Sequence, residues 1–405
     1  MHKTLPLTAI IALMASPVVI ASELEQRLAE TEARLAALEQ QNSIADRVRV
    51  NGFLTFGMQR TNTIRDAADN QVDFQGTDTD WNLRALSRAG IRITTDINDR
   101  AHAVVQMLAR GEDDFATDMQ WAYVAYEISP ALTWRAGRLV LPTYMHSQYT
   151  QASYAYPWVV LPSQVYGTLP IETLEGMDLT WKFTTGDISH SANLTWGATD
   201  VDTATGRYQV QNQTGINLIS YWGNLSTRIS YSVGETTLAL PDTTPAPTGD
   251  LSAFSLNKDF GYFASIGGQY DNGVWLLMAE LVQLGLNTPA SWFPTQTAGY
   301  VTAGRRFGKL MPHLTWTTVD SDIDADCAAN ANPVGCGFLV GSNTAHSKSW
   351  TLGARYDLSA GMALKAEATT FYDFTDGATV NSSLFASVPD TSNPTVFRLA
   401  VDAAF

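Results

Sequence analysis

The chain has 405 residues, with 25 lysines and arginines against 40 aspartates and glutamates, a formal net charge of −15. Only 16% of the residues are charged, against roughly 25% in soluble domains. The acidic balance excludes general nucleic-acid binding, because no basic cluster offers a footprint for phosphates. Two cysteines exclude a disulfide-framework miniprotein and a multi-cysteine metal site. Beyond the N-terminus no apolar run reaches about 18 residues, which excludes a helical membrane span there.

The N-terminus predicts export. Residues 1–21 combine a short charged start, an apolar stretch and a small residue, Ala21, at the end. This is the pattern of a cleaved signal peptide. A retained membrane anchor is the alternative, but Pro6 and Pro17 interrupt the apolar stretch. We expect cleavage after Ala21.

Residues 22–46 predict a short oligomerising helix. The seam of a coiled coil is predicted at alternating spacings of four and three: Leu24, Leu28, Thr31, Leu35, Leu38, Asn42 and Ala45, where the polar Thr31 and Asn42 interrupt the apolar positions. About three heptads are marginal alone, but chains already joined elsewhere raise the effective concentration of this segment. The alternative is a lone amphipathic arm that lies on another surface.

From residue 47 to residue 405 the apolar side chains alternate with period two, which predicts β-strands. Most of the runs are long enough to cross a bilayer at a tilt, which takes about 9–11 residues. We expect an all-β membrane protein, a 16-stranded antiparallel transmembrane β-barrel that follows the short periplasmic helix. The predicted strands are 48–60, 82–96, 100–111, 118–129, 131–140, 176–185, 187–199, 214–222, 224–234, 257–271, 273–285, 297–307, 309–320, 348–358, 361–374 and 394–405.

The connections between these strands alternate between short and long. Tight turns rich in Gly, Asn and Asp, such as 185–187 and 271–273, separate long connections such as 141–175 and 321–347. Strict alternation is typical of a barrel with one rim in the periplasm and the other outside the cell. Tryptophans in or next to the strands predict aromatic girdles at the two membrane interfaces. A soluble barrel with a tryptophan-rich core is the alternative, but the second strand face is mostly polar.

A leader segment, sixteen alternating strands and a terminal Phe405 together resemble the Gram-negative outer-membrane trimeric porins. The helix before the barrel is most similar to the DcaP-type porins, which are related to the phosphate-selective porins. The resemblance implies a homotrimer in the outer membrane, in contact with lipid and lipopolysaccharide and without a cofactor. It also implies that Phe405 is an assembly signal. Gly137-Arg138-Leu139 and the loop 141–175 are similar to a strand and third loop that fold inward and narrow the channel.

Basic residues are predicted to line the pore. Arg84, Arg88 and Arg92 are four apart on one strand face and would span roughly 26 Å, nearly the height of the hydrocarbon core. A lipid-facing arginine at the midplane costs about 2–4 kcal/mol, so a ladder that faces water is favoured. Pairing with lumen carboxylates is the alternative. The same parity is expected for Lys182, Arg228, Arg355, Lys365 and Arg398, while the orientations of Arg135/Arg138 and Arg305/Arg306 stay open.

The loop 141–175 is the predicted constriction. Its aromatic residues include Tyr144, Tyr149, Tyr154 and Trp158, and its only charged residues are Glu172 and Glu175. An aromatic, hydroxyl-rich lining opposite basic residues would suit small organic acids. Alternatively, these rings pack the loop onto the inner wall.

Cys327 and Cys336 lie in one long exported loop, which predicts a disulfide in an oxidising compartment. The disulfide is favoured over a metal site, because two thiols with only distant His346 are a poor ligand set. The loops around residues 112–118 and 320–326 are acidic; we expect solvated charge there, although oxygen-rich clusters could also hold cations that bridge lipopolysaccharide.

The sequence therefore predicts a passive or weakly selective diffusion channel for small hydrophilic solutes, with a preference for anions or small organic acids. No histidine lies in a Gly-x-Ser-x-Gly or His-x-x-Glu setting, so we expect no catalytic residues. The alternative function is a structural outer-membrane barrel tethered to a periplasmic partner through its coiled coil.

Overall fold

The computed structural model describes residues 30–34, 47–64, 71, 77–169, 171–203, 206–242, 248–374 and 393–405. The chain divides into two units, Met1–Arg49 and Val50–Phe405. In the first unit residues 30–34 are helical, and Arg34 pairs with Glu30 at 3.1 Å. The rest of the predicted coiled coil and the predicted signal peptide lie outside the described residues.

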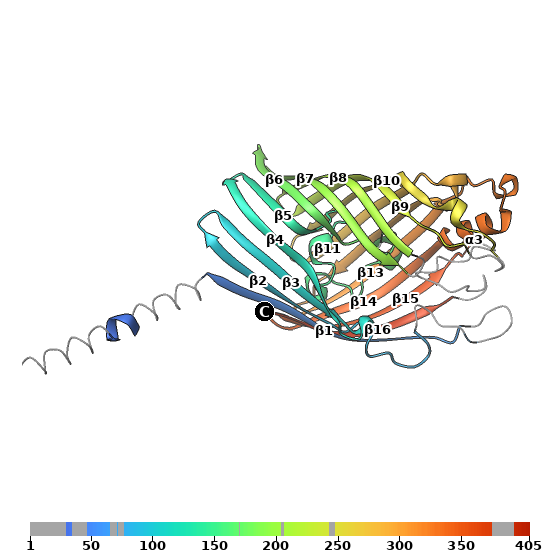
Figure 1. Ribbon diagram of the computed structural model, residues 1–405. Helices are drawn as coiled ribbons and strands as arrows, with labels where there is room; N and C mark the ends of the chain where they lie inside the picture. The colour runs from blue at the N-terminus through green and yellow to red at the C-terminus, as the bar shows by residue number, and fades with distance from the viewer. Residues whose placement is uncertain are drawn as a thin grey trace, which may run out of the picture. The chain divides into compact units, whose positions relative to one another are not determined.

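The second unit is a closed antiparallel barrel in which each strand pairs with its neighbours in the chain (Figure 1). Strand β1 pairs with β16, so the sheet has no open edge, as lipid requires. Each of the sixteen predicted strands corresponds to one observed strand. The strands are β1 (Val48–Thr61), β2 (Arg88–Asn98), β3 (Ala101–Arg110), β4 (Thr117–Ser129), β5 (Leu132–Val140), β6 (Thr173–Thr185), β7 (Ile188–Thr203), β8 (Gly206–Trp222), β9 (Leu225–Leu238), β10 (Leu256–Asp271), β11 (Trp275–Leu286), β12 (Thr295–Arg305), β13 (Leu310–Asp322), β14 (Ser347–Ser359), β15 (Met362–Tyr372) and β16 (Thr395–Ala404).

Short turns join the strands at one end of the barrel, and the helix α3 (Pro333–Asn343) lies at the opposite end (Figure 1). In the β10–β11 turn, Asn272 accepts hydrogen bonds from the backbone N–H groups of Val274 and Trp275 through its side-chain oxygen, at 3.0 and 2.7 Å. Gly273 follows with a φ of 81°, which favours glycine. These local bonds explain why the turn signals in the sequence marked the strand ends.

Large apolar side chains cover the outer face of the barrel. Trp196, Trp222, Leu352 and Phe397 are all exposed there, at alternate positions of their strands. Among the described residues, no helix is long and apolar enough to cross a membrane.

The inner face is polar on most strands, but β11 departs from this rule. Leu276, Met278 and Val282 are buried on the inner side of β11. The expectation of a polar second face is therefore wrong at this strand. The physical reason is that a loop covers the strand from within.

That loop, residues 141–172, connects β5 to β6 and packs inside the barrel. It contains the 3-10 helices η3 (Ser147–Tyr149) and η4 (Ser153–Ala155) and the helical turn α2 (Ser163–Tyr166). Most of its buried apolar residues form one cluster with the inner wall of β10–β13. The cluster joins Tyr144, Tyr156, Trp158, Leu161 and Val165 of the loop to Phe263, Met278, Tyr300 and Met311 of the wall. A large part of the apolar core therefore lies within the barrel.

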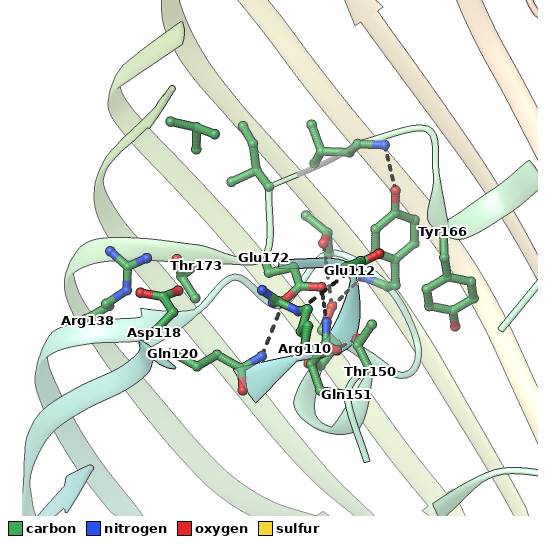
Figure 2. Close-up of a pocket in the computed structure, with 16 residues that line it drawn as sticks. Arg110, Glu112, Asp118, Gln120, Arg138, Thr150, Gln151, Tyr166, Glu172 and Thr173 are labelled. Carbon is green, nitrogen blue, oxygen red and sulfur yellow. Dashed lines mark hydrogen bonds and ion pairs between the residues drawn. The ribbon is translucent and has the colours of Figure 1, made fainter. Parts of the chain in front are cut away.

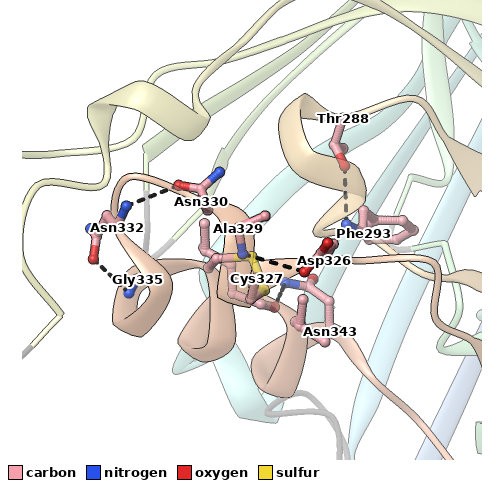
Figure 3. The surroundings of a disulfide bond; sticks show 12 residues. Thr288, Phe293, Asp326, Cys327, Ala329, Asn330, Asn332, Gly335 and Asn343 are labelled. Atoms are coloured by element: carbon pink, nitrogen blue, oxygen red, sulfur yellow. Dashed lines mark hydrogen bonds between the residues drawn. A yellow bond between two sulfur atoms is a disulfide. The ribbon is translucent and has the colours of Figure 1, made fainter.

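A second apolar cluster joins three long connections at the α3 end. It includes Phe254, Trp292 and Leu339, and it encloses the disulfide between Cys327 and Cys336, whose surroundings are drawn in Figure 3. Asn332 begins α3 by accepting a hydrogen bond from the backbone N–H of Gly335 at 2.9 Å. The disulfide and this cap hold the connection between β13 and β14 in a compact form.

Candidate functional site

A cavity of about 340 Å³ lies between the loop 141–172 and the barrel wall of β3, β4, β5 and β7 (Figure 2). Its lining is mostly polar. The wall supplies Arg110, Gln120 and Arg138, and the loop supplies Thr143, Tyr144, Ser147, Thr150, Gln151, Tyr166 and Glu172. The cavity lies on this side because the loop is fixed to the opposite wall by two sets of polar contacts.

The first set of contacts surrounds Glu280 of β11. Its carboxylate accepts hydrogen bonds from the backbone N–H of Met145 at 2.6 Å and from the hydroxyl of Tyr166 at 2.7 Å. Arg228 of β9 donates to the carbonyl of Met145 at 3.3 Å. Two buried wall charges thus hold the start and the end of the loop against β9 and β11.

The second set surrounds Lys365 of β15. Its ammonium group pairs with Asp402 at 2.9 Å and donates to the carbonyls of Ser153 and Trp158. Arg355 of β14 donates to the carbonyls of Tyr154 and Tyr156, at 2.6 and 3.2 Å. Backbone groups of the loop that its short helices leave unpaired must find other partners, and here wall charges provide them.

Glu172 at the end of the loop is the charge on which the cavity's donors converge. It accepts from Arg110 at 3.4 Å, from Gln120 at 3.2 Å and from Gln151 at 2.6 Å (Figure 2). Arg110 also approaches Glu112 at 3.9 Å. Burial raises the pKa of the Glu112 carboxyl, and the nearby Arg110 partly opposes this change.

The structure corrects the predicted arginine ladder at Arg84. Strand β2 begins at Arg88 and not at residue 82, so Arg84 lies in the preceding connection. The side-chain oxygen of Asn82 accepts from the backbone N–H of Arg84 at 2.9 Å, and this local bond replaces strand pairing. The Arg84 side chain is 59% exposed and pairs with Asp114.

Arg88 and Arg92 belong to β2, and both hydrogen-bond to neutral groups. Arg88 donates to the side chain of Gln151 and to the hydroxyl of Tyr156, each at 3.2 Å. Arg92 donates to Gln106 at 2.8 Å, and its guanidinium lies 4.1 Å from the ring centroid of Trp121.

Three other predicted pore residues point inward, but the loop or the wall covers them. Arg228 and Arg398 are each only 4% exposed. Arg398 donates to Gln59 at 3.4 Å and to Thr369 at 3.2 Å. Together with Arg355, these arginines connect parts of the barrel and its loop. Lys182 of β6, in contrast, is exposed and forms no ion pair among the described residues.

The two arginine pairs that the sequence left open are now placed. Arg135 donates to Asp178 at 2.9 Å, and Arg138 lines the cavity and pairs with Glu175. Gly137, between them, has a φ of 134°, a local departure from strand geometry.

At the end of β12, Arg305 lies 5.0 Å from the ring centroid of Trp275, whereas Arg306 binds Asp271 at 2.6 Å. The first contact involves an exposed aromatic ring, and the second holds the neighbouring short turn.

The predicted aromatic residues of the constriction pack onto the wall and onto one another. Tyr144 is within hydrogen-bond distance of Thr168, and Trp158 donates to Thr315 at 2.8 Å. Tyr149 contacts His146 at 3.0 Å, and the ring of Tyr154 lies 4.6 Å from the guanidinium of Arg355. This is the packing alternative that the sequence left open.

The two predicted end residues of the constriction separate in the structure. Glu172 ends the loop, whereas Glu175 belongs to β6. At the C-terminus, the backbone of Phe405 pairs with Gly52 of β1, at 2.8 and 3.0 Å, and its side chain is exposed.

Sequence reasoning missed the polar residues that organise the loop. Glu280, Asp402, Gln106 and Gln120 have inward strand parity, a signal that could have found them, whereas Gln151 lies in the loop and carries no such signal. Among the described residues there is no group of three side chains suited to hold a metal ion.

Comparisons with known proteins agree with this architecture. The profile of the family described as Gram-negative porin matches residues 7–377. No curated protein matches the sequence significantly.

Three solved structures are similar to the chain at low sequence identity. The channel DcaP of Acinetobacter baumannii has a TM-score of 0.56 at 11% identity, covering 88% of this chain and 97% of that one. The anion-selective porin from Comamonas acidovorans has a TM-score of 0.54 at 15% identity, covering 88% and 99%. The trimer form of OmpT of Vibrio cholerae has a TM-score of 0.54 at 13% identity, with the same coverage.

Proposed function

Because the chain belongs to the Gram-negative porin family, we propose that it is a passive, weakly selective outer-membrane channel for small hydrophilic solutes that prefers anions or small organic acids. The observation that carries this proposal is the polar cavity between the loop 141–172 and the wall of β3–β5, inside a closed barrel. Its polar lining suits hydrated solutes. The mature chain would begin after a cleaved signal peptide, 1–21.

The preference for anions rests on the partners of three cations. Arg88 and Arg92 bind amides, a hydroxyl group and an aromatic ring, and Lys182 is exposed. Their charges therefore act on passing ions without a contacting carboxylate. Arg110 and Arg138 pair with Glu172 and Glu175, so they contribute less.

We also propose a homotrimer, in which the segment 22–46 forms a periplasmic coiled coil. The trimer form of OmpT, which has the same fold, supports this assembly. The exposed apolar side chains on the outer face would contact lipid and lipopolysaccharide.

The test is ion conductance in planar bilayers. A fixed unit charge about 6 Å from a passing ion interacts with it by about 0.7 kcal/mol in water. After screening by salt, R88S and R92S should therefore each lower the anion-to-cation permeability ratio by about two- to threefold. The control is R305S, because Arg305 contacts the exposed ring of Trp275 and should leave the ratio unchanged. A silent wild-type protein would contradict the channel proposal, and unchanged ratios in both variants would contradict the anion preference.

A further inference from the structure

Three buried glutamines connect two arginines of β2 to one carboxylate. Along the first path, Arg92 donates to Gln106, Gln106 donates to Gln120, and Gln120 donates to Glu172. Along the second path, Arg88 donates to Gln151, and Gln151 donates to Glu172. Gln106, Gln120 and Gln151 are each less than a tenth exposed.

The direction of these bonds is set at both ends of each path, by an arginine and by Glu172. An arginine only donates hydrogen bonds, whereas a carboxylate only accepts them. Each glutamine therefore turns its oxygen toward the arginine and its amide N–H toward Glu172. If a glutamine were turned the other way, its amide N–H would face the N–H groups of the guanidinium. Both groups would then be donors without an acceptor, which is costly in a buried site.

We infer that Glu172 is a specificity-determining residue of the channel, because it positions Arg88 and Arg92 through the three glutamines without touching either one. The inference rests on the proposed channel function and deepens it. Arg110 is different, because Glu172 contacts it directly and lowers its effect on a passing ion. One carboxylate thus acts on three cations, of which Arg110 lines the cavity.

The test separates this positioning role from simple loss of charge. E172Q replaces the carboxylate with an amide, which has one acceptor oxygen for three converging donors. The matched control is E175Q, because Glu175 pairs with Arg138 and takes no part in the glutamine paths. Each variant removes one negative charge near the cavity. Reversal potentials in planar bilayers give the permeability ratio of each variant, alone and combined with R92S.

We expect R92S to lower the anion-to-cation ratio by about two- to threefold in the wild type and in E175Q. In E172Q the same substitution should change the ratio by less than 1.5-fold, since Arg92 is no longer held by an oriented Gln106. Equal effects of R92S in all three backgrounds would overturn the inference while leaving the channel function intact. Absence of conductance in the wild type would instead overturn the proposed function.

Q120L is the second variant, for the case that E172Q does not fold. It interrupts the path to Arg92 in the middle and changes no charge. In Q120L the effect of R92S should again fall below 1.5-fold, while the effect of R88S should be that of the wild type, because Arg88 uses the other path. A full R92S effect in Q120L would overturn the inference.

Discussion

The buried ion pair of Lys365 with Asp402 should be the most sensitive anchor of the loop. The ammonium and carboxylate groups lie 2.9 Å apart, and both side chains are 0% exposed. Asp402 also accepts from the hydroxyls of Thr55 and Ser153, at 2.7 and 3.1 Å. K365M removes the charge and the donors but keeps much of the side-chain volume.

The expected cost follows from what K365M leaves behind. Asp402 would remain buried without its countercharge, and removing one partner of such a pair costs about 3–5 kcal/mol. The carbonyls of Ser153 and Trp158 would also lose a donor, at roughly 1–3 kcal/mol for each buried group left without a partner. These losses overlap, so we expect a total of about 4–6 kcal/mol in the free energy of unfolding.

Unfolding by urea in detergent micelles, followed by tryptophan fluorescence, measures this cost. The matched control is K182M, because Lys182 is exposed on β6 and should change the free energy of unfolding by less than about 0.5 kcal/mol. K365M combined with D402L replaces both charges with apolar groups and should recover at least half of the loss.

Two results would refute this reasoning. One is a K365M protein that unfolds within about 0.5 kcal/mol of the wild type. The other is a double variant that is less stable than K365M alone, which would mean that the partnerless Asp402 is not the cause of the loss. Single-channel recordings add an independent measurement, because a loop released at Ser153 should produce larger and noisier conductance steps.

Three further predictions concern other parts of the loop and the barrel. Burial lowers the pKa of His146, in the loop, to about 3. Below about pH 6.5 the unfolded chain binds a proton at this histidine and the folded protein does not, so the free energy of unfolding should fall as the pH drops from about 6.5 toward 3. H146N should flatten this acid dependence in urea unfolding. C327S/C336S removes a cross-link across a short loop, worth about 2–3 kcal/mol in the chain-entropy account, and should speed proteolysis near α3 while β-sheet circular dichroism stays unchanged. G137A should lower the free energy of unfolding by about 1–3 kcal/mol, because Gly137 has a φ of 134° and an added Cβ would meet the carbonyl of Ala122; an unchanged urea midpoint would contradict it.

The strand order and most turns could be predicted from the sequence, because both depend on local patterns. Alternation along a strand repeats every two residues, and turns such as 271–273 carry their own Asn and Gly signals. The clearest error was the start of β2. Residues 82–85 alternate between polar and apolar side chains, but Asn82 caps the backbone at Arg84 and Ala85 and so replaces strand pairing there.

The partners of inward-facing charges could not be predicted, because they are distant in the sequence. Lys365 reaches Ser153 across 212 positions, and Trp158 reaches Thr315 across 157. Parity fixes which face a residue occupies but not what covers that face. The apolar inner face of β11, with Leu276 and Met278, is understandable only once the loop is placed against it.

The same contacts determine which arginines can act on a passing ion. A loop of irregular backbone inside a barrel needs donors and acceptors, and the wall charges that provide them, such as Arg228 and Arg355, are no longer open to solutes. Arg110 faces the cavity but lies beside Glu172. In the proposed channel, Arg92 should retain its electrostatic effect because an amide and an aromatic ring hold it without neutralising it. We therefore expect selectivity to depend less on the number of inward arginines than on whether their partners are charged.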